Sequence, residues 1–299
     1  MATIGEIAGL LTSLFFAVNA VVVTKATKTV GSSVIANRAR VAFALLYLVI
    51  LNTLLYHQAL PFQAGTQRWT WLSLSGVIGL AVGDAFLFQA YLMVGARLGT
   101  LLLSLSTIFG ALEAWLFLGE SLSILEIIGI ALTLGGIIWV ILEQGSNKSQ
   151  ALRPSALGLL CGVLAAIGQA TGLVLSKQGM AGDFSPISAN VIRMSAAVVA
   201  LWLITLLQRE AGKTIQTLKE NPAALRLLAL AALIGPVIGV SLSLLAVQNT
   251  VVGVASVLTS LSPIFMLPIS YFYFKERLGW QAIAGTILAV VGVAILFLA

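Results

Sequence analysis

The sequence predicts an all-α integral membrane protein, with ten transmembrane helices arranged as two inverted five-helix repeats. Three observations predict this fold class. Of the 299 residues, 60% are hydrophobic and only 9% are charged, whereas a soluble domain has about 25% charged residues. The apolar runs have the length of about 20 residues that a helix needs to cross a bilayer. Finally, residue patterns of the first half return in the second half.

Charged residues, glycines, prolines and polar clusters separate the apolar runs and define the expected spans. The runs do not alternate with a period of two, which argues against an outer-membrane barrel. The spans are expected at 4–24, 34–56, 69–94, 98–118, 123–142, 155–178, 187–207, 223–248, 252–274 and 279–298. A polar linker at 143–154 divides the chain into a first repeat, 1–142, and a second repeat, 155–299.

The two repeats align without gaps over three spans. One offset matches Gly79 and Gly83 to Gly235 and Gly239, which we interpret as close-packing positions between helices. Because five is an odd number, the second repeat must enter the membrane in the opposite sense. Lysines and arginines gather at the odd-numbered connections of the first repeat and at the opposite set in the second, as an inversion requires. Inverted repeats are typical of alternating-access carriers.

The segments SLSTIFGALEAWLFLGE and SLSPIFMLPISYFYFKE, at 104–120 and 260–276, each precede a glycine-containing apolar span. In these features the chain resembles the EamA-type branch of the drug/metabolite transporter superfamily. The resemblance implies a multi-pass carrier in the bacterial plasma (inner) membrane, an exporter of amino acids or other small metabolites. It also implies a central cavity lined by spans one, three, four, six, eight and nine. It further implies cytoplasmic termini, whereas the charge distribution favours termini outside, so the orientation stays open.

Asp84 is the first candidate for a binding residue. It lies near the middle of the third expected span, and Phe88 and Tyr91 follow at i+4 and i+7 on the same helix face. A carboxylate at that depth costs roughly 2.5–3.5 kcal/mol, so it should face a cavity or a partner. We interpret it as a cation- or proton-binding group beside an aromatic wall. The alternative is a structural pair with Arg40 or Arg193.

Glu113 is the second candidate. It shares a helix face with Ser106, seven residues earlier. The matching position of the second repeat is Ile269, so the fold itself does not require an acid here. Glu113 is therefore a possible second protonatable site. The alternatives are a side chain that reaches the membrane surface or a pair with an arginine such as Arg97.

Other polar or helix-bending residues on the expected cavity spans are further candidates for substrate or ion binding. They are Asn19, Gln89, Ser104, Thr107, Gln169, Ser241, Gln248, Ser260 and Pro263. Helix packing explains the hydroxyl residues equally well. Pro263 is expected to kink its span and free backbone carbonyls, and the first repeat has Thr107 in its place.

Duplicated charged residues have a structural interpretation. Arg40 and Arg193, each one turn after an asparagine, are read as anchors at the membrane surface. Glu120 and Glu276 are expected to bind backbone N–H groups at the start of the next helix.

The expected function is a secondary active transporter, an exporter of small polar metabolites such as amino acids or amines, with protons as the candidate coupling ion. The alternatives are a membrane channel and a lipid-acting membrane enzyme. The chain has one cysteine and one histidine and no P-loop sequence, so we expect no metal, no cofactor and no enzymatic activity. Its basic residues lie between apolar runs, which excludes a nucleic-acid partner. The expected partners are the lipid bilayer, a small solute and protons.

Overall fold

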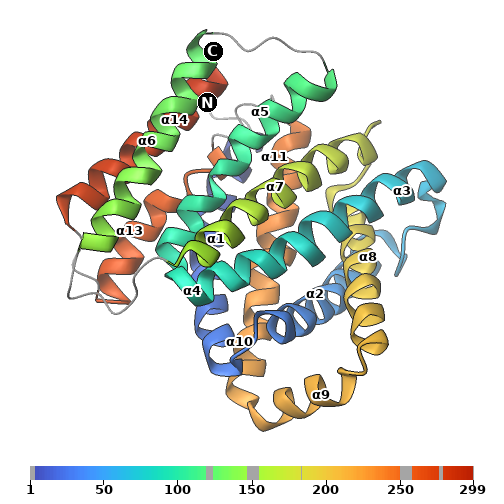
Figure 1. Cartoon of the computed structure of the whole chain (residues 1–299). Coiled ribbons are helices and arrows are strands. Elements are labelled where there is room, and N and C mark those ends of the chain that lie inside the picture. Colours follow the sequence, from blue (N-terminus) through green and yellow to red (C-terminus); the bar gives the residue numbers. More distant parts are fainter. Residues whose placement is uncertain are drawn as a thin grey trace.

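The computed structural model describes residues 4–118, 124–146, 155–182, 184–249, 258–275 and 279–298. Within these ranges the chain forms helices joined by turns and short loops, without a β-strand (Figure 1). The expected all-α class is therefore confirmed. Glu120, Glu276 and most of the linker lie outside the described residues.

The helices follow one another with short connections. In chain order they are α1 (Ile4–Val30), α2 (Ser33–Tyr56), η1 (Phe62–Ala64), α3 (Thr66–Ser75), η2 (Gly76–Gly83), α4 (Asp84–Leu103), α5 (Leu105–Leu118), α6 (Ile124–Ser146), α7 (Ala156–Gly179), α8 (Pro186–Leu207), α9 (Ala211–Glu220), α10 (Pro222–Ala232), η3 (Leu233–Gly239), α11 (Val240–Asn249), α13 (Ser262–Phe272) and α14 (Trp280–Leu298). Two of them, η2 and η3, are π-helices, whose backbone hydrogen bonds reach one residue further than in an α-helix.

Six helical segments of the described chain are long and apolar enough to cross a membrane. Four are the single helices α1, α2, α7 and α8. The other two are continuous through a π-helix and cover Thr66–Leu103 and Pro222–Asn249. Shorter apolar helices at Ile127–Val140, Ser262–Phe272 and Trp280–Ile295 accompany them. The chain is therefore a multi-pass membrane protein.

A kink interrupts the helix inside the segment that ends at Leu103. Gly95 has φ 84° and ψ 167°, which is not a helical conformation. A positive φ of this size is strained for residues with a Cβ and is open to glycine. The break falls between the expected third and fourth spans, at 69–94 and 98–118.

Glycines bring the π-helices against helices of the other half of the chain. A Cβ at Gly79 of η2 would lie 3.5 Å from Gly172 Cα of α7, so the two backbones touch. In the second half, a Cβ at Gly235 of η3 would lie 2.6 Å from Cγ of Asn19 in α1. The prediction that these glycines are close-packing positions is confirmed.

Helices α6 and α14 lie side by side at one corner of the molecule (Figure 1). Small residues set their separation, since a Cβ at Gly136 would lie 2.5 Å from Gly285 O, and one at Gly292 would lie 2.4 Å from Thr133 N. Such small-residue contacts are the usual way in which membrane helices approach closely.

Helices α2 and α8 run antiparallel, as contacts at both ends demonstrate. Arg38, near the start of α2, contacts Glu210 just after α8, with Nη1 3.1 Å from Oε2. At the other end, Ser188 Oγ near the start of α8 donates to Asn52 Oδ1 near the end of α2 at 2.8 Å. The same Arg38 donates to Thr214 Oγ1 of α9 at 2.9 Å. These bonds hold α9 across one end of the bundle (Figure 1).

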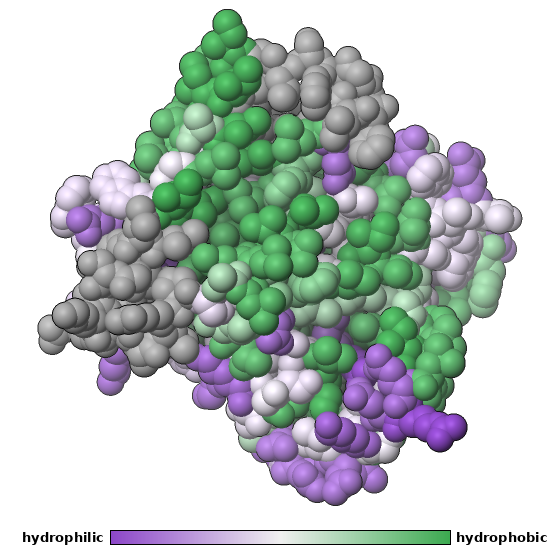
Figure 2. Space-filling model, viewed as in Figure 1, coloured by the Kyte–Doolittle hydropathy of each residue, from purple (hydrophilic) through white to green (hydrophobic). Residues whose placement is uncertain are grey.

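The surface agrees with a membrane location. Figure 2 shows apolar residues over the middle of this face and hydrophilic residues over the end of the molecule that holds α9. Large apolar side chains such as Leu54, Val199 and Leu203 are exposed on the long helices. Lipid contact accounts for exposed apolar side chains on a membrane protein, whereas a soluble protein rarely shows large apolar patches.

Candidate functional site

Asp84 lies at the centre of a buried charged cluster. It is the first residue of α4, directly after η2, and its residue is 8% exposed. Its carboxylate accepts a hydrogen bond from Nη2 of Arg40 on α2 and forms an ion pair with it. Arg193 on α8 also interacts electrostatically with Asp84. Of the alternatives that the sequence left open, the structure therefore contains the pair with Arg40.

The two arginines come from antiparallel helices. Each is the eighth residue of its helix, about 10 Å along the axis from the first residue. Because α2 and α8 are antiparallel, the two positions lie nearer to opposite ends of this helix pair. Arg40 and Arg193 are each only 3% exposed. The interpretation of both as surface anchors is wrong, because neighbouring helices enclose their side chains.

Two aromatic side chains border this cluster on the face that the sequence predicted. Phe88 and Tyr91 are 1% and 3% exposed, and their ring centroids lie 6.4 Å apart with the rings nearly parallel. The Arg40 Cζ atom lies 4.8 Å from the centroid of Phe88, within the range of a cation–π contact. Tyr91 packs on the backbone beyond the Gly95 break, since a Cβ at Gly99 would lie 2.4 Å from its Cδ1.

Glycines of η2 let α8 approach the cluster. A Cβ at Gly76 would lie 2.0 Å from the carbonyl oxygen of Arg193, and one at Gly79 would lie 3.6 Å from Nη2 of Arg193. Any larger residue at Gly76 would push α8 away. The sequence reasoning missed this contact, although a glycine three residues before the duplicated Gly79 was a visible signal.

Asn37 and Asn190 bind the backbone of the π-helices. Asn37 Nδ2 donates to Leu80 O at 3.1 Å and to Ala81 O at 3.2 Å. Asn190 Nδ2 donates to Pro236 O at 2.7 Å and to Ser241 Oγ at 3.1 Å. The candidate Ser241 thus has a partner in the same half of the chain. Sequence reasoning noticed the duplicated asparagines but assigned them no contact.

Glu113 lies apart from the Asp84 cluster. It is half-buried on α5, and its Oε1 accepts a hydrogen bond from Oγ1 of Thr171 on α7 at 2.6 Å. Within the described chain no contact joins it to Asp84, Arg40 or Arg193. The two carboxylates that the sequence singled out therefore belong to different interfaces.

Several hydrogen-bonding candidates have local partners. Gln89 Oε1 accepts from Ser33 Oγ at the start of α2 at 2.7 Å. Ser104 and Thr107 donate to backbone carbonyls within their own turns, Ser104 at 3.4 Å and Thr107 at 2.8 Å. Gln248 Nε2 donates to the backbone of Phe184 at 3.2 Å, just before α8. These residues stabilise helix ends and turns in this conformation.

The remaining candidates occupy separate places. Asn19 is buried in α1 against η3, and Gln169 is half-buried on α7. Ser260 is buried before α13, and Pro263 is buried in the first turn of that helix. The structure brings Asp84, Phe88 and Tyr91 together with the two arginines and leaves these four residues at other positions.

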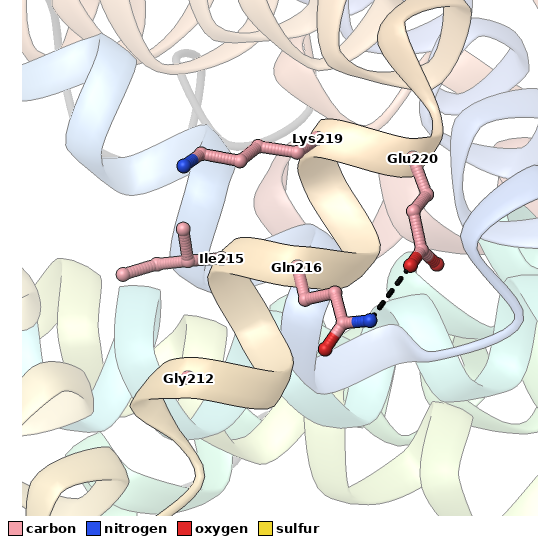
Figure 3. A pocket seen from close by; sticks show the side chains of 5 residues that line it. All are labelled: Gly212, Ile215, Gln216, Lys219 and Glu220. Atoms are coloured by element: carbon pink, nitrogen blue, oxygen red, sulfur yellow. Dashed lines mark hydrogen bonds between the residues drawn. The ribbon is translucent and has the colours of Figure 1, made fainter.

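A shallow depression lies on the outer face of α9 (Figure 3). Its volume is about 500 Å³, and its lining residues are Gly212, Ile215, Gln216, Lys219 and Glu220. All five belong to one face of a single helix, and Gln216 Nε2 donates to Glu220 Oε1 at 2.8 Å. None of the candidate residues lines it, so it is separate from the Asp84 cluster.

Long apolar helices around a buried charged cluster define an integral membrane protein with ionisable groups in its interior rather than a soluble binding module. The model of the EamA-like transporter family matches residues 3–142 and again residues 156–298. The chain therefore belongs to the EamA-like transporter family, within the drug/metabolite transporter superfamily. The resemblance seen in the sequence is confirmed.

Comparison with solved structures supports the fold. One crystal structure, described only as that of a protein, superposes with a TM-score of 0.63 at 14% sequence identity. The match covers 97% of this chain and 95% of the other. At this identity the likeness shows a shared fold and no more. A search of curated proteins finds no match.

Proposed function

We propose that this chain is a secondary active transporter that exports a small polar metabolite, such as an amino acid or an amine, across a bacterial plasma membrane. The observation that carries the proposal is the buried cluster of Asp84, Arg40 and Arg193 between apolar helices. Ionisable residues inside a membrane protein are expensive and mark substrate or ion pathways. Membership of a transporter family supports the same conclusion.

The proposed architecture is ten spans in two inverted repeats, 1–142 and 155–299, that rock against each other. The antiparallel helices α2 and α8 support it, because they carry the matching residues Arg40 and Arg193. The π-helices support it as well, since η2 contacts α7 and η3 contacts α1. Alternating access in such folds works by movement of one repeat against the other around a site near the midplane.

The proposed orientation places the α9 end of the molecule in the cytoplasm. Basic residues gather at this end of the bundle, on α9, near the ends of α1 and α10, near the start of α2 and just after α8. They include Lys25, Lys28, Arg38, Arg209, Lys213, Lys219 and Arg226. An excess of lysine and arginine marks the cytoplasmic side. The start of α1 then lies outside. A cysteine introduced at exposed Ile4 should react with a membrane-impermeant maleimide in intact cells, and protection of this position would reverse the orientation.

Counterflow in proteoliposomes tests the transport function. Vesicles loaded with an unlabelled amino acid mixture should accumulate labelled amino acids faster than empty vesicles, with saturation at high concentration. Asp84→Asn should lose at least 90% of this uptake, whereas Glu220→Gln, an exposed acid on α9, should retain it. Uptake by Asp84→Asn at the wild-type rate would show that the cluster takes no part in transport. Uptake that never saturates would favour a channel.

Protons are the proposed coupling ion, with Asp84 and Glu113 as the candidate acids. Asp84 lies in the apolar segment Thr66–Leu103, and Glu113 lies in α5, within the expected fourth span. Protonatable carboxylates inside a membrane commonly serve as proton relays. An imposed pH gradient should drive concentrative transport by the wild type. Transport that ignores the gradient but responds to a sodium gradient would replace the proton with sodium.

A further inference from the structure

The buried cluster contains more positive charge than negative charge. Two arginines enter it, from α2 and from α8, and in the described chain both interact with the same acid, Asp84. Arg40 forms an ion pair with Asp84 and lies over the ring of Phe88. Arg193 shares Asp84 only through a longer-range electrostatic interaction. The Nε atoms of both arginines are buried without a hydrogen bond.

The imbalance follows from a difference between the two halves of the chain. Each π-helix is followed directly by an α-helix, and the first residue of that helix is Asp84 in the first half and Val240 in the second. Each half supplies an arginine, but only the first half supplies an acid at the matching position. Arg193 therefore has no acid from the matching position of its own half and shares Asp84 with Arg40.

Three further acids of the described chain have other partners. Glu113 is bonded to Thr171, Glu210 to Arg38, and Glu220 to Gln216. Two guanidinium groups that share one carboxylate in an apolar interior leave an excess positive charge, which is unfavourable. A ligand with a negative charge offsets that excess. Arginine is also the side chain whose planar fork fits a carboxylate with two parallel hydrogen bonds.

We propose that Arg193 binds a negatively charged group of the transported solute, most simply a carboxylate. This inference rests on the proposed transport function and names its substrate class. The solute is an anion or a zwitterion, and simple amines are excluded. Gly76 and Gly79 bring the η2 backbone beside Arg193 without side chains. Asp84 forms its ion pair with Arg40, so the Arg193 guanidinium keeps hydrogen-bond donors for the solute.

Binding of acetate to the purified full-length protein tests the inference without transport. Sodium acetate should raise the thermal midpoint of the wild type, because a ligand that binds the folded state stabilises it. The uncharged isostere acetamide should have no effect. Arg193→Gln should bind acetate at least tenfold more weakly. Lys177→Gln removes an exposed positive charge on α7 and should respond like the wild type, which controls for general salt effects.

Arg193→Lys is the second variant, for the case in which Arg193→Gln does not fold. It keeps the charge and loses the bidentate geometry, so acetate binding should weaken several-fold. Without acetate, Arg193→Gln should unfold at or above the wild-type midpoint, because it removes one of two buried positive charges that share a single acid. A midpoint far below the wild type, or equal acetate binding by Arg193→Gln and wild type, would overturn the inference.

Different results would overturn the anion site at Arg193 and the transport function. Acetate binding through Arg193 in a protein without counterflow would overturn the transporter and leave the anion site. Saturable counterflow of methylamine, at the same rate in Arg193→Gln as in the wild type, would support the transport function. It would overturn the proposal that Arg193 binds a negatively charged group of the solute.

Discussion

Asn37 and Asn190 make the same hydrogen bond in the two halves of the chain. Each donates its side-chain Nδ2 to a backbone carbonyl of a π-helix, Leu80 O in the first half and Pro236 O in the second. Leu80 and Pro236 match at the offset that aligns Gly79 with Gly235. The bonds fix α2 and α8 to segments whose backbone departs from the α-helical pattern.

Replacing either asparagine by alanine should therefore have a similar effect. Asn37→Ala and Asn190→Ala each leave buried carbonyl groups without a side-chain donor, and each should cost about 1–3 kcal/mol of unfolding free energy. Asn249→Ala is the control, because Asn249 is exposed and bonds only within its own helix. Thermal unfolding in detergent measures all three. Unequal losses at the two positions, with one near zero, would contradict the equivalence.

Gly76 should not tolerate a side chain. Its missing Cβ would lie 2.0 Å from the Arg193 carbonyl oxygen, so Gly76→Ala must move two backbones apart. Overpacking of this kind typically costs about 1–3 kcal/mol, and backbone contact puts Gly76→Ala at the upper end.

Gly110→Ala is the matched control for that substitution. Nothing lies within 4 Å of a Cβ at Gly110 in α5, and alanine favours a helix by roughly 0.5–1 kcal/mol over glycine. The two variants should therefore shift the unfolding midpoint in opposite directions. A Gly76→Ala protein as stable as the wild type would mean that η2 and α8 lie further apart.

The Arg40–Asp84 pair should show strong coupling in a double-mutant cycle. Asp84→Leu leaves Arg40 buried without its acid, and Arg40→Met leaves Asp84 without its hydrogen-bond donor. Each single change should cost about 3–5 kcal/mol, whereas the double variant should be less destabilised than either. Chemical unfolding of the four proteins checks this. Additive losses would show that the two charges act independently.

Removing Arg38 and removing Glu210 should destabilise the protein by different amounts. The Arg38 side chain is 2% exposed and that of Glu210 is 45% exposed. Glu210→Ala removes the acid from a buried arginine that keeps its hydrogen bonds to Thr214 and Gln208, and it should cost about 1.5–3 kcal/mol. Arg38→Met leaves an acid that water can solvate. The midpoint of thermal unfolding should therefore decrease more for Glu210→Ala than for Arg38→Met. Glu220→Ala, on the exposed face of α9, is the control, and the reverse order would contradict the burial argument.

Glu113 should matter for coupling more than for folding. Glu113→Gln retains an oxygen that accepts the hydrogen bond from Thr171, so the stability should change by less than about 0.5 kcal/mol. The same variant cannot bind a proton and should flatten the pH dependence of proteoliposome transport. Thr171→Val should show the opposite pattern, with lower stability and an unchanged pH profile. Loss of stability in Glu113→Gln with a normal pH profile would assign Glu113 a structural role.

Much of the helical plan follows from the sequence. The long apolar runs predicted membrane helices, and the polar break near Gly95 predicted the end of a span. The spacing of Asp84, Phe88 and Tyr91 predicted one shared face, and the structure has all three in one cluster. These features depend on local composition and on the 3.6-residue period, which a single stretch of sequence contains.

The partners of the charged residues were decided by tertiary structure. Arg40 and Arg193 read as surface anchors, but the antiparallel packing of α2 and α8 encloses them beside Asp84. Glu113 bonds Thr171 because α5 rests on α7. The sequence determined a membrane transporter built from related halves. Which buried charges meet, and which of the two arginines forms the ion pair with Asp84, depends on helix rotation and depth. Contacts between distant helices have no signature in local periodicity.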